Sequence, residues 1–117
     1  MNRYLLVKSG IDFNQGLRRF NNNRAMYESF LLAFLKDENF AELCTAIERH
    51  DVKAAFQYAH SLKGIAGNLS MQKLYAALNP LVEELRADSL VNADALLEPV
   101  KETYGLLRDT LGAMQAD

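Results

Sequence analysis

The chain has 117 residues, of which 50% are hydrophobic and 24% charged, with only two prolines, and these totals fit one globular domain of ordinary size. Thirteen basic and fifteen acidic residues leave a net charge of -2, which argues against nucleic acid or an anionic membrane surface as a partner. The single cysteine, Cys44, excludes an internal disulfide, and no cluster of cysteine and histidine has the spacing of a zinc site.

Neither a leader peptide nor a membrane span is expected from the pattern of apolar residues. The first ten residues hold one short apolar run, residues 4–7, without the long apolar region or cleavage pattern of a signal peptide. No stretch approaches the roughly 20 apolar residues of a membrane span. We therefore expect residues 1–10 to be a linker or flexible start, and the domain to be cytoplasmic. If the natural chain is longer, an anchor could lie outside this sequence, with the domain on the cytoplasmic side.

Nearly every segment after Asp12 has helical periodicity, and none has the alternation of a strand. Asp12 is a candidate N-cap for a short first helix, which Gly16 weakens by about 1 kcal/mol relative to alanine. Residues 21–23 then break the pattern and offer a cap. From Arg24, apolar residues spaced by three and four continue to Ile47 and predict one long or bent helix.

The next predicted helix begins after Asp51, a candidate N-cap, and runs to about Asn68. His50 lies just before it, at the end of the long helix, where an imidazolium would be stabilised by the helix dipole. The following helix has a candidate cap at Ser70 and contains Pro80. An interior proline removes a backbone hydrogen bond and clashes with the preceding turn, which predicts a kink or a break there.

The last helix is expected to open at Asn92 or Asp94, with Pro99 near its first turns, and residues 112–117 are expected to fray. Short connections between four substantial helices predict an all-α fold, namely an up-and-down antiparallel four-helix bundle with a short extra N-terminal helix. Residues 1–117 would form a single domain, which we expect to act as a monomer.

His60 lies on the solvent side of the central helix. At about 100° of turn per residue, the apolar side chains of this helix fall in one arc of about 120°, centred roughly 160° from His60. These apolar residues are Ala55, Tyr58, Ala59, Leu62, Ile65, Ala66 and Leu69. The imidazole therefore points to solvent. A single exposed histidine usually has no special role, but a neutral imidazole is a good nucleophile near neutral pH.

The neighbours of His60 strengthen the case for function. Gly64 and Gly67 lie within about 60° of it, and two glycines inside a helix cost about 2 kcal/mol relative to alanine. One explanation is that glycine lets a partner surface approach the imidazole, and the other is close helix packing. Lys63, one turn onward, could place a positive charge beside an anionic group on His60. Phe56, one turn earlier, is either the edge of the core or a partner contact.

The run His60-Ser61-Leu62-Lys63-Gly64, followed by Ala66-Gly67-Asn68-Leu69, resembles the phosphoacceptor motif of histidine-containing phosphotransfer (HPt) domains of bacterial two-component phosphorelays. The resemblance extends to residues 10–12, 16–17 and 27–34 upstream, to Leu43, Ala46 and Asp51, and to the stripe of Leu74, Leu78 and Leu81 downstream. The chain departs from the pattern at two positions. Ser70 stands where many members have glycine. Many members also have a glutamate directly after the leucine that corresponds to Leu81, where this chain has Val82 and then Glu83.

The resemblance implies a helical bundle that takes a phosphoryl group from an aspartate of a response-regulator receiver domain and passes it to another receiver. By position, His60 would be the phosphoacceptor and Lys63 its charge partner. Contacts to the docked receiver would come from the same face: Phe56, Gln57, Gly64 and Gly67. The exposed residues around 24–34 are a second candidate contact surface.

Other functions stay open beside this one. The chain could be a helical adaptor that binds a receiver without phosphotransfer, or the phosphoacceptor domain of a larger hybrid or chemotaxis-type sensor histidine kinase. No metal site or cofactor of its own is expected, because the sequence shows neither a carboxylate cluster nor a phosphate-binding loop leading into Lys-Ser/Thr. We expect the partner receiver to supply Mg²⁺, and no autonomous kinase activity. A hydrolytic enzyme is disfavoured, since spacing fixes no second acid or base near His60.

Overall fold

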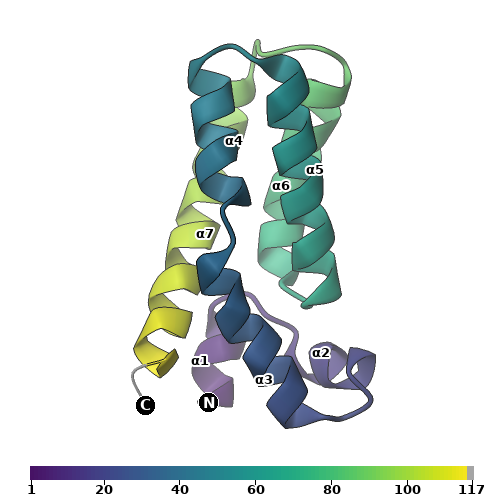
Figure 1. Cartoon of the computed structure of the whole chain (residues 1–117), viewed down its shortest axis with the longest axis vertical. Coiled ribbons are helices and arrows are strands. Elements are labelled where there is room, and N and C mark those ends of the chain that lie inside the picture. The colour runs from purple at the N-terminus through teal and green to yellow at the C-terminus, as the bar shows by residue number, and fades with distance from the viewer. Residues whose placement is uncertain (116–117) are drawn as a thin grey trace.

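The computed structural model describes residues 1–115, and within them every regular element is a helix, which confirms the all-α prediction (Figure 1). The elements in chain order are α1 (Arg3–Lys8), α2 (Phe13–Arg19), α3 (Arg24–Ala33), a 3₁₀ turn (Phe34–Lys36), α4 (Asn39–Glu48), α5 (Val52–Asn68), α6 (Gln72–Arg86) and α7 (Ala93–Gln115). Residues 112–115, which were predicted to fray, are helical as the end of α7, and residues 116–117 of that prediction lie outside the described part.

The bundle runs up and down as predicted. α4 packs on α5, α5 on α6, and α6 on α7. In Figure 1 the α4–α5 and α6–α7 connections lie at the upper end, and the α5–α6 turn lies lower down. α3 extends the direction of α4 downward, and α1 and α2 close the lower end. No helix within residues 1–115 combines the length and the apolar character needed to span a membrane.

The long helix predicted from Arg24 to Ile47 is in fact two helices with a break between them. Asp37 has extended backbone (φ -71°, ψ 134°), so the helical path stops there. Its carboxylate accepts hydrogen bonds from the Asn39 backbone N–H at 3.2 Å and from the Asn39 side-chain amide at 2.7 Å. A short polar side chain that binds nearby backbone competes with the helix, which explains the break.

The predicted linker over residues 1–10 is instead largely helical, as α1. Asn2 caps it by accepting a hydrogen bond from the Leu5 backbone N–H at 3.1 Å, and α1 packs against α2 and α7. Leu6 is fully buried, whereas Tyr4 and Val7 stay exposed. Because only one side chain of this short helix enters the core, the sequence shows no periodicity that would have predicted it.

Three of the predicted helix caps are confirmed. The side chains of Asp12, Asn23 and Asp51 each accept a hydrogen bond from the backbone N–H three residues onward, at 3.1 Å in every case. The prediction for Ser70 is wrong. Ser70 has φ +57° and is buried, and the residue that precedes α6 is Met71, which makes no side-chain cap.

Of the kink or break predicted near Pro80, the break does not occur, since α6 continues through it to Arg86. Pro80 is exposed on the outer face of the helix, while the inner face is fully buried at Leu78, Leu81 and Val82. Burial of such side chains contributes about 1.5–3 kcal/mol each, which offsets the roughly 3 kcal/mol cost of an interior proline. Pro99 lies in the second turn of α7, close to the predicted start of that helix.

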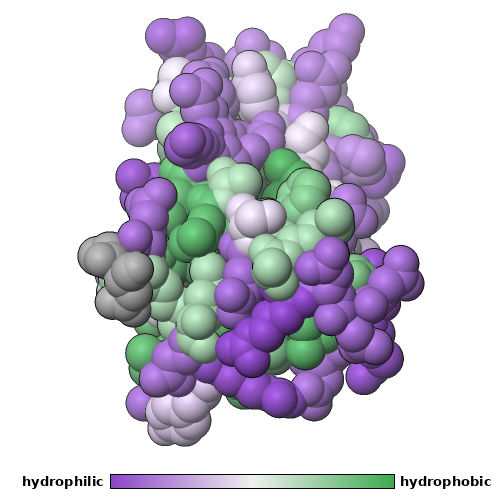
Figure 2. Space-filling view, turned by 60° about the horizontal axis from the view of Figure 1, so that its bottom comes forward, coloured by the Kyte–Doolittle hydropathy of each residue, from purple (hydrophilic) through white to green (hydrophobic). Residues whose placement is uncertain are grey.

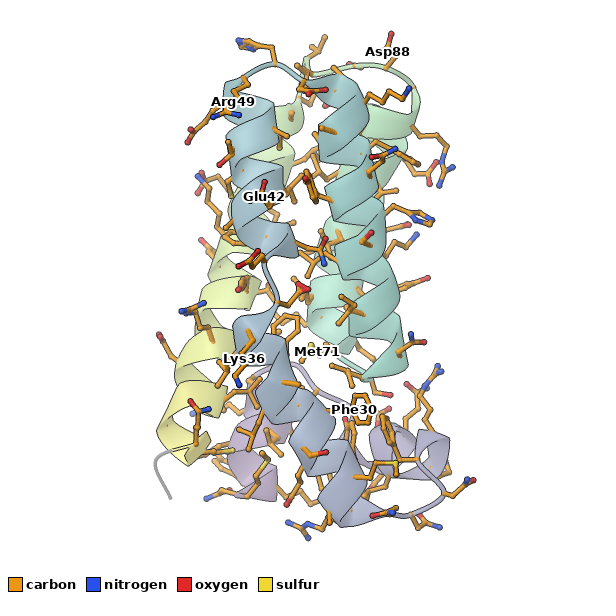
Figure 3. All side chains as sticks on the ribbon, in the orientation of Figure 1. Phe30, Lys36, Glu42, Arg49, Met71 and Asp88 are labelled. Atoms are coloured by element: carbon orange, nitrogen blue, oxygen red, sulfur yellow. The ribbon has the colours of Figure 1, made fainter. Side chains whose placement is uncertain are left out.

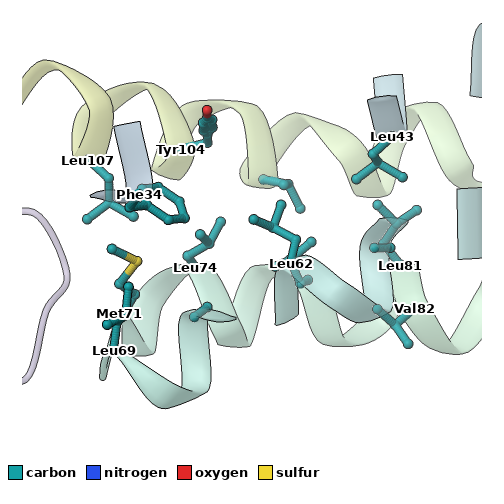
Figure 4. Close-up of a cluster of buried hydrophobic side chains, with 14 of the residues drawn as sticks. Phe34, Leu43, Leu62, Leu69, Met71, Leu74, Leu81, Val82, Tyr104 and Leu107 are labelled. Atoms are coloured by element: carbon teal, nitrogen blue, oxygen red, sulfur yellow. The ribbon is translucent and has the colours of Figure 1, made fainter. Parts of the chain in front are cut away.

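The core fixes the orientation of α5. Its buried residues are Ala55, Ala59, Leu62 and Ala66. Leu62 points into a cluster made by Leu43 of α4, Leu74 and Leu81 of α6, and Tyr104 of α7 (Figure 4). Three alanines on one helical stripe let the neighbouring helices approach α5 closely. The opposite side of α5 therefore faces away from the core.

Candidate functional site

His60 is exposed in the middle of α5, as the periodicity predicts. Its ring stacks on Phe56, one turn earlier, with the ring centroids 5.6 Å apart and the planes inclined by 19°. Offset stacking of this kind favours one orientation of the imidazole over free rotation. Leu62, two residues onward, is fully buried, so the backbone beneath His60 is anchored in the core.

Arg86 of α6 is a second contact of the Phe56 ring. The guanidinium carbon of Arg86 lies 5.0 Å from the centroid of the Phe56 ring, and its Nε lies 3.5 Å from a carboxylate oxygen of Glu83. Phe56 is half-buried and packs against the core, so the ring that both His60 and Arg86 contact is itself held in place. Sequence reasoning missed Arg86, because it lies in α6, far along the chain from Phe56, and only the tertiary fold brings the two together.

The ammonium of Lys63 is held by α6. Its Nζ donates a hydrogen bond to Oδ1 of Asn79 at 2.7 Å and lies 5.1 Å from the centroid of the Tyr75 ring. Both contacts are favourable for a cation, and neither partner neutralises its charge. Lys63 is thus an ordered positive charge one turn from His60. Asn79 and Tyr75 were not singled out by the sequence, since neither lies on α5.

The two glycines of α5 differ in their surroundings. A Cβ added at Gly64 would meet no atom within 4 Å, so nothing in the described fold accounts for glycine there. A Cβ at Gly67 would lie 3.3 Å from Cε2 of Tyr75, tighter than an ordinary contact. Close packing against Tyr75 therefore explains Gly67, whereas Gly64 leaves an open approach beside His60.

Gln57 is exposed one turn before His60. It lines a groove of about 470 Å³ together with Phe56 and Arg86 at the upper end of the α5–α6 pair. Asp88 of the same groove is labelled near the top of Figure 3. Gln57 and Phe56 therefore share one surface depression on the His60 side of α5.

The second candidate contact surface, around residues 24–34, lies at the other end of α5. Phe30 is 50% exposed and lines a groove of about 540 Å³ with Phe20, Ile65 and Leu69. Apolar side chains gather on this end of the molecule with polar side chains around them (Figure 2). Ile65 lies about 140° around α5 from His60, at about 100° of turn per residue, so this groove opens on another side of the helix than the His60 face.

The other reactive side chains stand apart from His60. His50 is exposed beyond the end of α4 with φ +56°, and its backbone N–H donates to the Ile47 carbonyl at 3.0 Å. Burial raises the pKa of the half-buried Cys44 thiol above its ordinary value. Among residues 1–115, no three histidine, cysteine, aspartate or glutamate side chains are grouped as metal ligands would be.

Comparison with protein families gives a match to the Hpt domain over residues 35–117, which is more than two thirds of the chain. The match contains His60, both α5 glycines and all of α4, α5 and α6. The upstream resemblance at residues 10–34 lies outside it, so α1, α2 and α3 precede the matched part. No curated protein and no solved structure matches the chain.

Proposed function

Because this chain belongs to the family of Hpt domains, which act in histidine phosphotransfer in two-component systems, we propose that His60 is its phosphoacceptor. In this proposal His60 takes a phosphoryl group from an aspartate of a receiver domain and passes it to another receiver. The observation that carries the proposal is the exposed imidazole in the middle of α5, beside the open backbone of Gly64. A partner surface can approach this imidazole without displacing any side chain at position 64.

The chemical step needs a nitrogen nucleophile and a leaving carboxylate. The lone pair of the unprotonated His60 nitrogen forms the N–P bond as the P–O bond to the receiver aspartate breaks. The aspartate leaves with the electron pair as a carboxylate, and the other imidazole nitrogen keeps its proton. Transfer to a second receiver is the same step in reverse, with an aspartate oxygen as the nucleophile. Stacking on Phe56 supports the proposal by restricting how the imidazole can turn.

Charge neutralisation is the second requirement of phosphoryl transfer. We assign this role to Lys63, whose ammonium is ordered one turn from His60 and has no carboxylate partner among its contacts. Gly64 is the opening for the receiver, and Phe56 and Gln57 are the proposed docking contacts. Gly67 would act indirectly, by making room for the Tyr75 ring that lies against Lys63. In this proposal Mg²⁺ belongs to the receiver, and the domain does not phosphorylate itself.

The test is incubation with receiver domains carrying a radiolabelled phosphoryl group. The wild-type chain is expected to take up label that is acid-labile and base-stable, as a phosphohistidine is. His60→Gln should take up none, whereas His50→Gln should be labelled like the wild type, because it alters the other histidine of the chain. If the wild type binds a phosphorylated receiver but stays unlabelled, the domain is an adaptor and the transfer role is wrong.

A further inference from the structure

A second groove, of about 650 Å³, runs between α2 and the C-terminal half of α5. Its lining includes Gln15 and Arg19 of α2, Lys63 and Gly64 of α5, and Tyr75 of α6. In Figure 1, α2 lies beneath the lower end of α5. Lys63 and Gly64 are also neighbours of His60, so this groove is continuous with the face proposed for phosphotransfer.

Hydrogen bonds hold α2 against the α5–α6 turn. The Asp12 backbone N–H donates to the Ser70 carbonyl at 2.9 Å, and the Gln72 amide donates to the Asp12 carboxylate at 3.3 Å. The Ser70 hydroxyl donates to the Gln15 side-chain oxygen at 3.0 Å. These contacts join the beginning of α2 to both helices of the site. The position of Arg19, at the end of α2, is thereby set relative to Lys63.

The groove carries positive charge that the chain itself does not neutralise. Its lining residues include the two cations Arg19 and Lys63 and no carboxylate. Arg19 is exposed, and within residues 1–115 it takes part in no ion pair. Lys63 is bound by an amide oxygen and an aromatic ring. An anionic side chain would find two uncompensated cations here.

We propose that this groove receives an acidic surface segment of the docking receiver, and that Arg19 helps to select which receiver docks. The inference rests on the proposed function, because the occupant is the protein that docks over His60. Residues 64–68 lie about 6–12 Å along α5 from His60, within the footprint of an ordinary protein interface of about 800 Å² per partner. α2 precedes the residues matched to the Hpt domain, so the family match does not imply this contact.

Charge at the edge of an interface acts mainly on the association rate and is weakened by salt. Reversing the charge at position 19 should therefore slow transfer from the receiver at low salt and lose its effect at high salt. Arg18 offers a matched control, since it is adjacent in α2, exposed and equally charged, but does not line the groove.

The experiment compares Arg19→Glu, Arg18→Glu and wild type with the receiver that phosphorylates the wild type fastest. The readout is the second-order rate of labelling from that receiver, divided by the rate of labelling from phosphoramidate, a donor with no protein surface. At 50 mM salt the ratio should fall about tenfold for Arg19→Glu and stay near the wild-type value for Arg18→Glu. At 500 mM salt the ratio for Arg19→Glu should return to the value shared by Arg18→Glu and the wild type.

A second variant keeps Arg19 in place. Gln15→Glu adds a carboxylate to the groove while preserving an oxygen that can accept the Ser70 hydrogen bond, and it should also lower the ratio at low salt. Equal ratios for all variants and the wild type would overturn the inference and leave the proposed function standing. An equal fall for Arg18→Glu and Arg19→Glu would also overturn it, since the cause would be net charge. Absence of wild-type labelling from every receiver would overturn both.

Discussion

At the scale of single residues, the position of one ammonium group depends on a side chain from the neighbouring helix. Asn79 accepts a hydrogen bond from Lys63 Nζ at 2.7 Å, and the ring of Tyr75 lies beneath the same group. A lysine side chain has four rotatable bonds, so such contacts reduce the conformational entropy that must be lost when it meets a phosphoryl group. We regard Asn79 as a positioning residue for Lys63.

Asn79→Leu should slow phosphoryl transfer to His60 by about 2–10-fold, because a hydrogen bond worth about 0.5–1.5 kcal/mol no longer orders the ammonium. The measurement is the transfer rate from a phosphorylated receiver. The same substitution made in a Lys63→Met background should change the rate little, since the group that Asn79 positions is then gone. Equal losses in the two backgrounds would contradict a role exerted through Lys63.

At the scale of elements, four helices end in the same way without glycine. Asn21, His50, Ser70 and Asp88 all have positive φ, between +53° and +59°. At the end of α5 the Met71 N–H donates to the Ala66 carbonyl at 2.8 Å and the Ser70 N–H to the Gly67 carbonyl at 3.2 Å, which is the Schellman pattern. The residue at this position is usually glycine, so Ser70 was misassigned as the cap of the next helix.

Features that depend on residues close together in the chain could be predicted from the sequence. The three caps at Asp12, Asn23 and Asp51 bind backbone only three residues away, and the exposure of His60 follows from the periodicity of one helix. The contacts that surround His60 could not be predicted this way. Lys63 and Asn79 are 16 residues apart, and the approach of Arg86 to Phe56 depends on how α5 and α6 pack.

Gly64→Ala separates the stability of α5 from its function. Since a Cβ there meets no atom within 4 Å, alanine should stabilise the fold by up to about 1 kcal/mol through its helix propensity. The same substitution should slow transfer from a receiver, because the methyl group stands in the proposed path of the partner. Urea denaturation and the transfer rate measure the two effects.

Gly105→Ala is the matched control for that experiment, because Gly105 is also an exposed helical glycine with open space around its Cβ position, but lies in α7. It should stabilise the protein to a similar degree and leave the transfer rate unchanged. If Gly64→Ala transfers as fast as Gly105→Ala, the opening at Gly64 has no function in docking.

At the scale of the whole molecule, Tyr27 joins the N-terminal helices to the bundle. Its ring is fully buried on α3 between Phe13 and Phe20, at centroid distances of 5.7 and 5.1 Å. Its hydroxyl donates to the Leu69 carbonyl at the end of α5 at 2.7 Å. The same ring occupies the space beside Gly16 of α2. One side chain therefore fixes α2 and α3 against the helix that carries His60.

Gly16→Ala should destabilise the protein by about 1–3 kcal/mol, although alanine favours helix over glycine. An added Cβ would overlap Cζ and the hydroxyl oxygen of Tyr27, whose ring is fully buried and whose hydroxyl is hydrogen-bonded to the Leu69 carbonyl. The free energy of unfolding from urea titration measures the effect. Stability equal to or above that of the wild type would mean that Tyr27 is not held as tightly as its burial indicates.

The stability of the fold should also fall in strong alkali through Tyr27. Burial, and then the negative charge of Asp12, raise the pKa of the Tyr27 hydroxyl to about 12, while an unfolded tyrosine titrates near 10. Between these values the unfolded chain loses the proton that the folded chain keeps. Alkali therefore favours unfolding throughout that window, and the stabilisation present below pH 10 is lost as the pH approaches 12.

Tyr27→Phe isolates this effect from the other titrating groups. The variant should be less stable than the wild type at pH 8, by about 1–3 kcal/mol, because the Leu69 carbonyl loses its buried donor. The difference in free energy of unfolding between the two proteins should then shrink as the pH rises from 10 to 12, because only the wild type loses the stabilisation that depends on the Tyr27 proton. The contributions of the other tyrosines and the lysines cancel in this difference, since both proteins contain them. A difference that stays constant over this window would show that the hydroxyl titrates alike in the folded and unfolded chain, and that its burial does not tie the N-terminal helices to α5.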